Sequence, residues 1–201
     1  MIEISKIDVY GWEAAIRGMR NPLNSWERSD SNGSEIGPAD LDLMKRLFKA
    51  GTEHRKYLRM VHCTLDVNAP LYWWKEFDTY KVATVSNSCS TMHKIAAKEF
   101  TREDFAYDHL SEGALAVLDT VIRQLNLSRE TYLQSKSKDD WWDMIQLLPS
   151  SYMQKRTIDL NYETVFNIMG QRKGHKLDEW RVMVGEFEKL PYVQELLKTR
   201  D

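Results

Sequence analysis

Cysteines and long apolar runs are both scarce in this chain of 201 residues. The two cysteines, Cys63 and Cys89, are too few for a disulfide framework, and neither belongs to a CxxC pair of the kind that binds zinc. We therefore expect a reducing, cytoplasmic setting. No apolar run approaches the roughly 20 residues that a membrane-spanning helix requires, so we expect a soluble protein with no membrane partner.

An excess of either charge is also missing. Lys and Arg together number 28, and Asp and Glu together number 30, which is unlike the basic surface of a nucleic-acid-binding protein. A free nucleotide is still compatible with this balance, because it needs only a local pocket with a few cations. We expect a small-molecule partner and no nucleic acid.

Several common site motifs do not occur. The chain has no GxGxxG, GxxxxGK[ST], HExxH or GxSxG, so no dinucleotide-binding turn, P-loop, zinc-binding helix or hydrolase elbow is indicated. The five histidines have no close metal-ligand spacing. We predict no metal site.

The first half of the chain mixes strand and helix patterns. Apolar residues alternate with polar ones where a strand is expected and recur every three or four residues where a helix is expected. The expected elements are a strand at 2–10, helices at 12–19 and 39–50, a strand at 57–67 and a helix at 71–77. The polar stretch from 24 to 38 predicts a long surface loop, and loops of that length often form lids or binding loops.

The second half shows mainly helical spacing. Its apolar stripes are Leu115, Leu118, Ile122 and Leu125, then the segment 141–148, then Ile158, Tyr162, Val165 and Met169, and finally a charged helix over 177–197 that Pro191 interrupts. We predict a single α+β domain over residues 1–201. Residues 1–110 would form a mixed α/β core portion and residues 111–201 a mainly helical portion.

A resemblance begins at the end of the second expected strand. Ala69-Pro70-Leu71-Tyr72 is followed by Glu76-Phe77 and then by Thr79-Tyr80-Lys81-Val82-Ala83-Thr84. This order resembles the central block of flavin-dependent thymidylate synthases, which carry Ala-Pro-[apolar]-[aromatic], Gln-Trp and RHRxxS. Lys81 keeps a cation of that signature and Thr84 its hydroxyl, whereas threonine and tyrosine replace the first arginine and the histidine. In the same register, Ser86, Asn87, Cys89 and Thr91 fall on the family's Asn, Glu, Ser and Arg.

A second block lies further along the chain. Leu148-Pro149 and Tyr152-Met153 precede Asn161, Asn167 and Arg172, with Asp178-Glu179-Trp180 beyond them. This block is similar to the family's Leu-Pro and Tyr-Thr, its Asn-x-Arg, a further Asn and Arg, and a Gln-Trp-Glu-like stretch. Glu163 replaces the arginine of Asn-x-Arg, and Ile145 stands where the family places an arginine that binds the substrate phosphate. The two blocks together span residues 57–181.

The resemblance implies the fold of that family and a set of site residues. Arg172 and Lys81 would be catalytic, and Glu76, Asn87, Ser88, Cys89 and Arg172 would bind the substrate. Thr79, Tyr80, Lys81, Thr84, Asn161 and Asn167 would bind FAD. It further implies NADPH and methylenetetrahydrofolate as co-substrates, and a homotetramer whose active sites combine several subunits.

Two interpretations of the late residues stay open. Asn161 and Arg172 are eleven residues apart, which on one helix brings them within about 20° of each other, so they would line a single pocket. Alternatively, Asn161, Asn167 and Arg172 form the solvated face of an amphipathic helix. The aromatic run 72–77 either faces a flat ligand or packs in the core, and packing in the core is favoured. The basic run 54–59 either binds phosphates or forms an exposed face, and the exposed face is favoured.

Two functions therefore stand at this point. One is an enzyme, a flavin-dependent methyltransferase that carries out one-carbon transfer to a pyrimidine deoxynucleotide, converting dUMP to dTMP or acting on a variant of it. The other is a divergent relative that has lost thymidylate synthesis and acts as a nucleotide-binding or assembly protein. The replaced RHRxxS cations, which would stabilise negative charge, separate the two.

Overall fold

The computed structural model describes residues 1–199. Its strands are β1 (Glu3–Tyr10), β2 (His62–Pro70), β3 (Thr84–Ser88) and β4 (Met153–Asn161). Its helices are α1 (Trp12–Arg20), α2 (Pro38–Lys49), α3 (Leu71–Phe77), α4 (Thr91–Lys94), α5 (Glu112–Ser135), α6 (Lys138–Leu147), α7 (Tyr162–Arg172), α8 (Asp178–Phe187) and α9 (Val193–Leu197). This mixture confirms the predicted α+β fold class.

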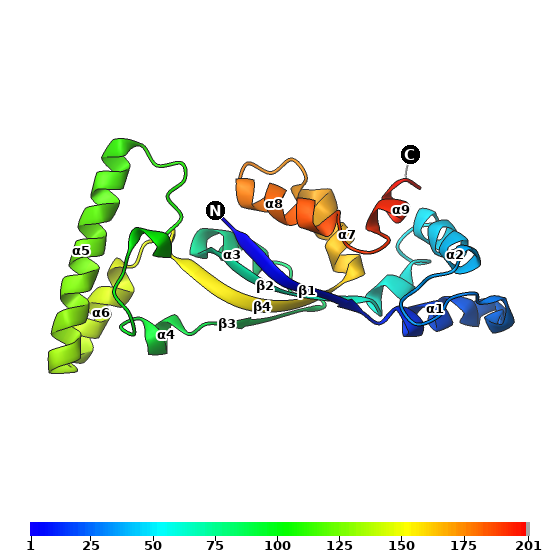
Figure 1. Ribbon diagram of the computed structural model, residues 1–201, viewed down its shortest axis with the longest axis horizontal. Coiled ribbons are helices and arrows are strands. Elements are labelled where there is room, and N and C mark those ends of the chain that lie inside the picture. The colour runs from blue at the N-terminus through cyan, green and yellow to red at the C-terminus, as the bar shows by residue number, and fades with distance from the viewer. Residues whose placement is uncertain (200–201) are drawn as a thin grey trace. The chain divides into compact units, whose positions relative to one another are not determined.

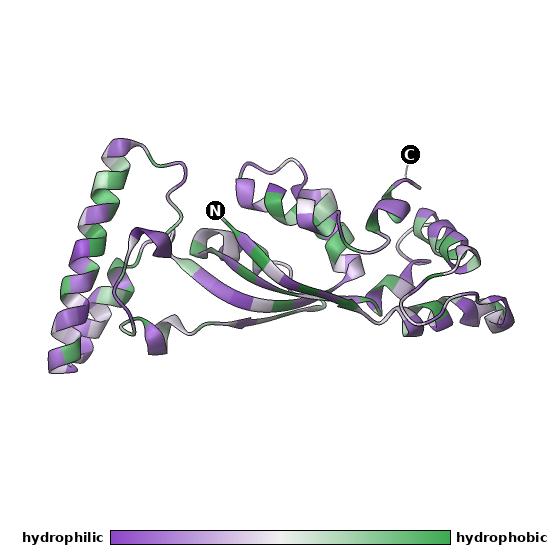
Figure 2. Cartoon of the chain, in the orientation of Figure 1, coloured by the Kyte–Doolittle hydropathy of each residue, from purple (hydrophilic) through white to green (hydrophobic). Residues whose placement is uncertain are grey.

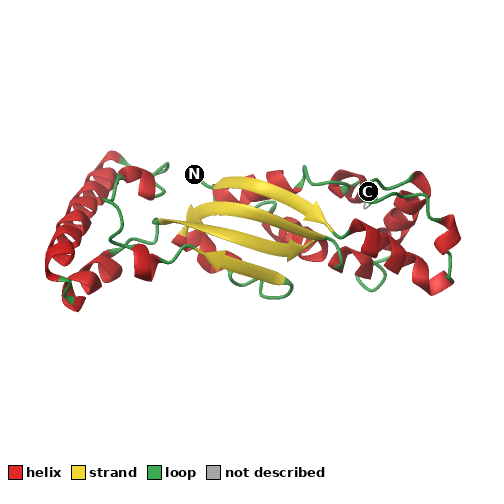
Figure 3. Ribbon diagram, turned by 60° about the horizontal axis from the view of Figure 1, so that its bottom comes forward, coloured by secondary structure: helices red, strands yellow, loops and turns green. Residues whose placement is uncertain are grey.

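Within the described residues, the strands form a four-stranded antiparallel sheet in the order β1-β2-β4-β3 (Figure 3). The strand β2 alternates between buried and half-exposed side chains from His62 to Ala69, and Pro70 at its end is buried too. The buried residues of the alternating part are Cys63, Leu65, Val67 and Ala69. Because successive side chains of a strand point to opposite faces, β2 presents one apolar face to the core and one polar face.

The chain divides into two compact units, and each strand contributes residues to both. The α5 unit contains residues 1–3, 67–79 and 87–156, and the α7 unit contains residues 4–66, 80–86 and the chain from residue 157 onward.

In the α5 unit, α5 and α6 lie side by side (Figure 1). Lys136 adopts the left-handed conformation directly after α5, and Ser137 then caps α6 by accepting a hydrogen bond from the backbone N–H of Asp139. Figure 2 shows that α5 alternates hydrophobic and hydrophilic residues along its length. Its apolar stripe packs in a core made of Ile95, Phe100, Phe105, Leu118, Ile122, Leu125 and Met144.

In the α7 unit, α7 packs against α8, and α2 packs against α9. The strand β1 passes into α1 through Gly11, whose φ is 95°. A Cβ atom at Gly11 would lie 2.1 Å from the carbonyl oxygen of Met60, so both the backbone angle and the space require glycine. No helix among the described residues has both the length and the apolar character to cross a membrane.

Most expected elements in the first half are confirmed within a residue or two, whereas the second strand is not. Lys56–Arg59 form a 3₁₀ turn, and β2 begins only at His62 and continues to Pro70. The turn is favoured because the adjacent residues Tyr57 and Leu58 are both buried, which a strand with one apolar face cannot achieve. In the second half, β4 was not expected, because Ile158 also fits the helical stripe that ends at Met169.

Candidate functional site

The residues that the sequence nominates divide between the two units. Glu76, Thr79, Asn87, Ser88 and Cys89 belong to the α5 unit. Tyr80, Lys81, Thr84, Asn161, Asn167 and Arg172 belong to the α7 unit. The α5 unit holds a pocket rich in lysine, and the α7 unit holds a cluster around Arg172.

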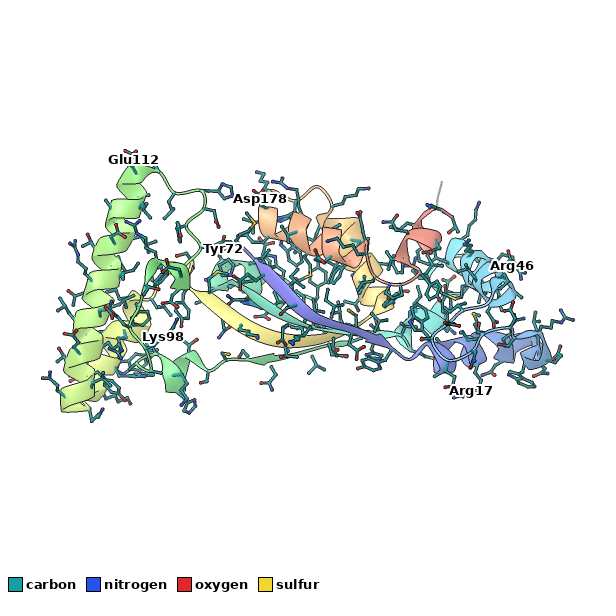
Figure 4. All side chains as sticks on the ribbon, viewed as in Figure 1. Arg17, Arg46, Tyr72, Lys98, Glu112 and Asp178 are labelled. Atoms are coloured by element: carbon teal, nitrogen blue, oxygen red, sulfur yellow. The ribbon has the colours of Figure 1, made fainter. Side chains whose placement is uncertain are left out.

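The lysine pocket has a volume of about 330 Å³ and is lined from the end of β3, from α4 and from the start of β4. Its lining includes Cys89, Ser90, Thr91, Lys94, Lys98, Tyr152, Met153, Gln154 and Lys155. Two separate stretches of sequence, 89–98 and 152–155, therefore meet in one cavity. Lys98 lies in the segment that follows α4 (Figure 4).

Backbone hydrogen bonds fix the position of Cys89 in this pocket. Its N–H donates to the carbonyl oxygen of Lys155 at 2.9 Å, and its own carbonyl accepts from Nε2 of Gln154 at 3.1 Å. Gln154 Nε2 also donates to Oγ1 of Thr91 at 3.2 Å. Ser90 caps α4, as expected for a serine-rich turn before a helix, by accepting from the N–H of His93. The thiol of Cys89 is exposed.

The charges of the pocket favour an anion. Three lysines line it against two acidic residues, Glu103 and Asp104. Lys98 forms an ion pair with the buried Asp104, and this hydrogen bond raises the pKa of the lysine ammonium. Lys94 is exposed and makes no ion pair with any residue from 1 to 199. Burial raises the pKa of the Tyr152 phenol, so this residue presents a neutral hydroxyl group.

A further cation, Arg156, lies on β4 of the same unit and was missed from the sequence. Its guanidinium stacks 4.2 Å from the ring centroid of Trp74. Nη1 donates to Oδ1 of Asp78 at 2.8 Å, and Nε donates to Oε1 of Gln154 at 3.0 Å. Recognising β4 would have revealed it, since alternation along that strand puts Gln154 and Arg156 on the same face.

The other residues of the α5 unit have local roles. Thr79 donates through Oγ1 to the carbonyl oxygen of Glu76 at 2.7 Å, which closes the end of α3. The Glu76 side chain is half-buried, and Asn87 and Ser88 are exposed at the end of β3. The preferred interpretation of the aromatic run is confirmed for Trp73, Trp74 and Phe77, because each is at most 1% exposed.

The arginine cluster of the α7 unit consists of Tyr80, Arg172 and Trp180. The guanidinium of Arg172 lies 4.6 Å from the ring centroid of Trp180 and 5.5 Å from that of Tyr80. Its Nε donates to Oη of Tyr80 at 2.8 Å, and this hydroxyl in turn donates to Oε1 of Gln171 at 2.9 Å. Gln171 donates to Oδ1 of Asn167 at 3.0 Å. The side chain of Arg172 is thus held in one orientation.

The segment before β3 is attached to α7 at two points. Tyr80 contacts the end of α7, and the carbonyl oxygen of Val82 accepts from Oγ1 of Thr164 at 3.2 Å near its start. Ala83 adopts φ 54°, a left-handed conformation that costs energy in a residue other than glycine. Lys81 is exposed in this segment and pairs with no acidic residue among residues 1–199.

The start of α7 is built differently from the expected continuous helix. Asn161 ends β4, is only 5% exposed and caps α7, because its Oδ1 accepts from the N–H of Thr164 at 3.0 Å. It therefore does not share a helical face with Arg172.

The expectation of an exposed basic run is wrong for Arg55, which is 9% exposed and binds Glu163 through Nε and Nη2 at 2.8–3.2 Å. Glu163, at the position of the family's arginine, thus faces a cation from another segment.

Metal ligands do not gather in either region. Within residues 1–199, no three side chains of His, Cys, Asp or Glu lie in an arrangement that would hold a metal ion.

Solved structures that match the chain over nearly its whole length include the following three. A flavin-dependent thymidylate synthase ThyX from Helicobacter pylori, complexed with FAD and dUMP, has a TM-score of 0.72 and 18% identity, covering 96% of this chain and 97% of that chain. A second structure of the same enzyme with FAD and dUMP gives 0.74 and 16%, covering 100% and 99%. The UMP/dUMP methylase PolB from Streptomyces cacaoi, bound with 5-Br UMP, gives 0.66 and 12%, covering 100% and 92%.

This chain has the flavin-dependent thymidylate synthase fold. No family model matches it, and no curated protein matches its sequence. The resemblance drawn from Ala69-Pro70 and from the Asn161-to-Arg172 spacing is therefore confirmed for the fold.

Residues of both blocks of sequence contribute to both regions described above. The first block includes Tyr80 of the arginine cluster and ends in the stretch 89–91, which lines the lysine pocket. The second block includes Tyr152 and Met153, which line the lysine pocket as well. The rest of the second block forms α7 and the start of α8, including Arg172 and Trp180. The sequence therefore located both regions but not the lysines, because Lys94 and Lys98 match no residue of the family's motifs.

Proposed function

We propose that this protein is a flavin-dependent methyltransferase that uses a folate donor and NADPH to transfer a one-carbon unit to a pyrimidine deoxynucleotide, either dUMP or a variant of it. The observation that carries the proposal is the lysine pocket, in which the two family-like blocks meet around an excess of cations. The fold supports it, since the ThyX structures with this fold are complexed with FAD and dUMP.

In this proposal the nucleotide phosphate binds in the lysine pocket. Lys94 and Lys98 supply point charges in place of the arginines that the family uses, and the N–H and hydroxyl groups around Cys89 add donors. Asn87, Ser88 and Glu76 would complete the contacts to the sugar and base. Ammonium groups on flexible stems give charge without a fixed bidentate geometry, so we expect the pocket to tolerate variation in the nucleotide.

The α7 unit would hold the flavin. Lys81 and Arg172 are cationic, and Asn167 carries an exposed amide, so the donors suit the pyrophosphate and carbonyl groups of FAD. Tyr80 and Thr84 would contribute hydroxyl groups. Asn161 would act indirectly, since its side chain is used to cap α7. Bound FAD would supply the hydride that completes the transferred methyl group.

The catalytic roles proposed for this chain are electrostatic. Arg172, which lies against two aromatic rings, would donate N–H groups to a carbonyl oxygen of a bound ligand as negative charge develops on it. Lys81 would stabilise the same charge or the flavin anion. Both act without a nucleophilic side chain. We further propose a cytoplasmic homotetramer, in agreement with the division of the nominated residues between separated segments of the chain.

One observation favours the alternative, a nucleotide-binding or assembly protein without thymidylate synthesis. Tyr80 stands where the family has histidine, and its hydroxyl accepts the Nε–H of Arg172. A catalytic arginine engaged in this way is less available to a ligand.

The test begins with the absorbance spectrum of the purified protein, before and after incubation with FAD. The NADPH oxidation rate is then measured with and without dUMP. Flavin uptake and an NADPH oxidation rate that rises with dUMP support the proposal. A protein that takes up no FAD contradicts it. A flavoprotein that ignores dUMP but responds to another pyrimidine nucleotide contradicts only the choice of substrate.

A further inference from the structure

A second pocket, here called the α1 pocket, lies in the α7 unit between α1 and the irregular segment 26–33. Its volume is about 170 Å³. Its polar and aromatic lining comes from Glu13, Arg17, Arg20, Trp26, Ser29 and Ser31. None of these residues lines the lysine pocket or belongs to the arginine cluster, so the proposed function gives this pocket no role.

The α1 pocket contains a buried cation with unused hydrogen-bonding capacity. Arg20 is 6% exposed, and its Nε donates to Oδ1 of Asp40 at 2.8 Å. Its Nη2 forms an ion pair with the same oxygen at 2.7 Å, but no atom of residues 1–199 accepts a hydrogen bond from it with suitable geometry. An anion in the pocket would give this buried N–H group a better-aligned acceptor.

The other oxygen of Asp40 is already occupied and offers Arg20 no second acceptor. Oδ2 accepts from the hydroxyl groups of Ser29 and Ser31, both at 2.7 Å, and from the N–H of Asp30 at 3.1 Å. Burial alone would raise the pKa of Asp40, but the hydrogen bonds from Ser31, Ser29 and Arg20 outweigh it and lower the pKa. The carboxylate is therefore ionised and holds the segment 29–31 against α1.

Further contacts make this wall of the pocket rigid. Asp30 accepts from the N–H groups of Ala39 and Asp40 at the start of α2, at 2.8 and 3.1 Å. Gly37 donates its N–H to Oγ of Ser31 at 2.9 Å, and a Cβ atom at Gly37 would lie 2.3 Å from the carboxyl carbon of Asp30. The long polar segment expected to be a binding loop is thus pre-organised and not a loose lid.

The remaining lining supplies a second cation and a flat ring. Arg17 is exposed one turn before Arg20 on α1, so two arginines and Glu13 line the pocket, and Asp40 pairs with Arg20. Trp26 is 51% exposed, and its Nε1 donates to Oδ1 of Asn21 at 2.8 Å, which fixes the indole. Paired arginines suit a phosphate group, and an exposed, fixed indole suits a stacked ring.

The size of the pocket limits the ligand. Pockets for drug-sized ligands usually measure about 300–1,000 Å³, so 170 Å³ accommodates a phosphate head group while the rest of the ligand lies over the rim. We propose that the α1 pocket binds a phosphomonoester that carries a flat ring, with Arg17 and Arg20 gripping the phosphate and Trp26 stacking on the ring. The site is separate from the proposed methyltransferase site and does not depend on it.

The experiment uses phenyl phosphate and inorganic phosphate as probes at pH 8 and constant ionic strength. Affinity is measured by calorimetry, and the location of binding by hydrogen exchange of peptides covering residues 26–37. Both probes should slow exchange in 26–37, and phenyl phosphate should bind about tenfold more tightly because of stacking. No protection of 26–37 by either probe, up to the highest concentration that stays soluble at pH 8, overturns the proposal. Protection of 89–98 alone also overturns it, since that assigns the phosphate to the lysine pocket.

Two variants and one control localise the effect. Arg17→Ala should weaken both probes about tenfold or more, whereas Arg46→Ala, an exposed arginine of α2 outside the pocket, should leave them unchanged (Figure 4). Trp26→Ala should reduce the affinity for phenyl phosphate to that for inorganic phosphate. Equal effects of Arg17→Ala and Arg46→Ala, or an unchanged preference for phenyl phosphate in Trp26→Ala, contradict the proposal.

Discussion

The cations of the lysine pocket and those that contact α7 are held in opposite ways. Lys94 projects its ammonium group from an exposed position on a flexible stem, and the exposed Lys98 is held only at its tip, by Asp104. Arg172 lies against two aromatic rings at the end of α7, and Arg55 is held by Glu163 near its start. The contrast indicates adaptable charge recognition in the first region and fixed, directional recognition in the second.

The largest effect is expected from adding a cation at the start of α7. Glu163→Arg restores the residue type that the family carries, but it places a second guanidinium against the largely buried Arg55. We expect a loss of about 3 kcal/mol or more in the free energy of unfolding, measured by urea denaturation. Glu53→Arg, at an exposed position of the same unit, is the matched control and should change little.

The double variant Arg55→Glu with Glu163→Arg should recover part of the lost stability, because it restores opposite charges. If Glu163→Arg is as stable as the wild type, the start of α7 is not fixed by this ion pair, and the contrast with the lysine pocket fails there.

The second prediction concerns Arg172. Arg172→Ala should weaken dUMP binding about 100-fold, equivalent to about 2.7 kcal/mol, because a pre-oriented guanidinium is lost. The circular dichroism spectrum should stay unchanged. Arg181→Ala on α8, which removes an exposed arginine paired with Asp178, is the control. An unchanged dUMP affinity in Arg172→Ala would remove this residue from the site.

The third prediction addresses the lysine pocket. Lys94→Ala should weaken dUMP about tenfold but deoxyuridine hardly at all, because the lost charge faces the phosphate. The dependence of dUMP affinity on salt should decrease as well. Lys138→Ala, an exposed lysine at the start of α6, is the control. Equal losses for dUMP and deoxyuridine would place the phosphate elsewhere.

The fourth and smallest effect is protection of Cys89 from alkylation. Burial raises the pKa of the Cys63 thiol to about 12, so at pH 8 only about one such thiol in ten thousand is ionised. Iodoacetamide should therefore modify the exposed Cys89 alone in the native protein, and both cysteines in urea. Saturating dUMP should slow modification of Cys89 about threefold or more, as followed by mass spectrometry. Modification at the same rate with and without dUMP argues against binding in the lysine pocket.

The sequence predicted the fold through local signals that the structure retains. Pro70 was sufficient to predict the helix α3 that follows it, and the stripe from Leu115 to Leu125 was sufficient to predict α5. The β4 strand was missed because Ile158 satisfies two periodicities at once, and only pairing with β2 and β3 decides between them. Tertiary contacts of this kind are not visible in a local pattern.

The site was predicted less completely, for a related reason. Arg172 could be named because its spacing from Asn161 follows the family. The sequence did not reveal Arg156, because it lies on the missed strand β4. It did not reveal Lys94 and Lys98 either, because they match no residue of the family's motifs. Asn161 was assigned to a continuous helix with Arg172, so its use as the cap of α7 was hidden.

The most direct test of the proposed function is product formation. The protein reconstituted with FAD is incubated with dUMP, methylenetetrahydrofolate and NADPH, and dTMP is quantified by chromatography, with Arg172→Ala run in parallel. We predict that the wild type forms dTMP, or the 5-methyl product of a related pyrimidine nucleotide, and that Arg172→Ala forms at most about one hundredth as much. A flavin-loaded wild-type protein that methylates no pyrimidine nucleotide would contradict the proposed function.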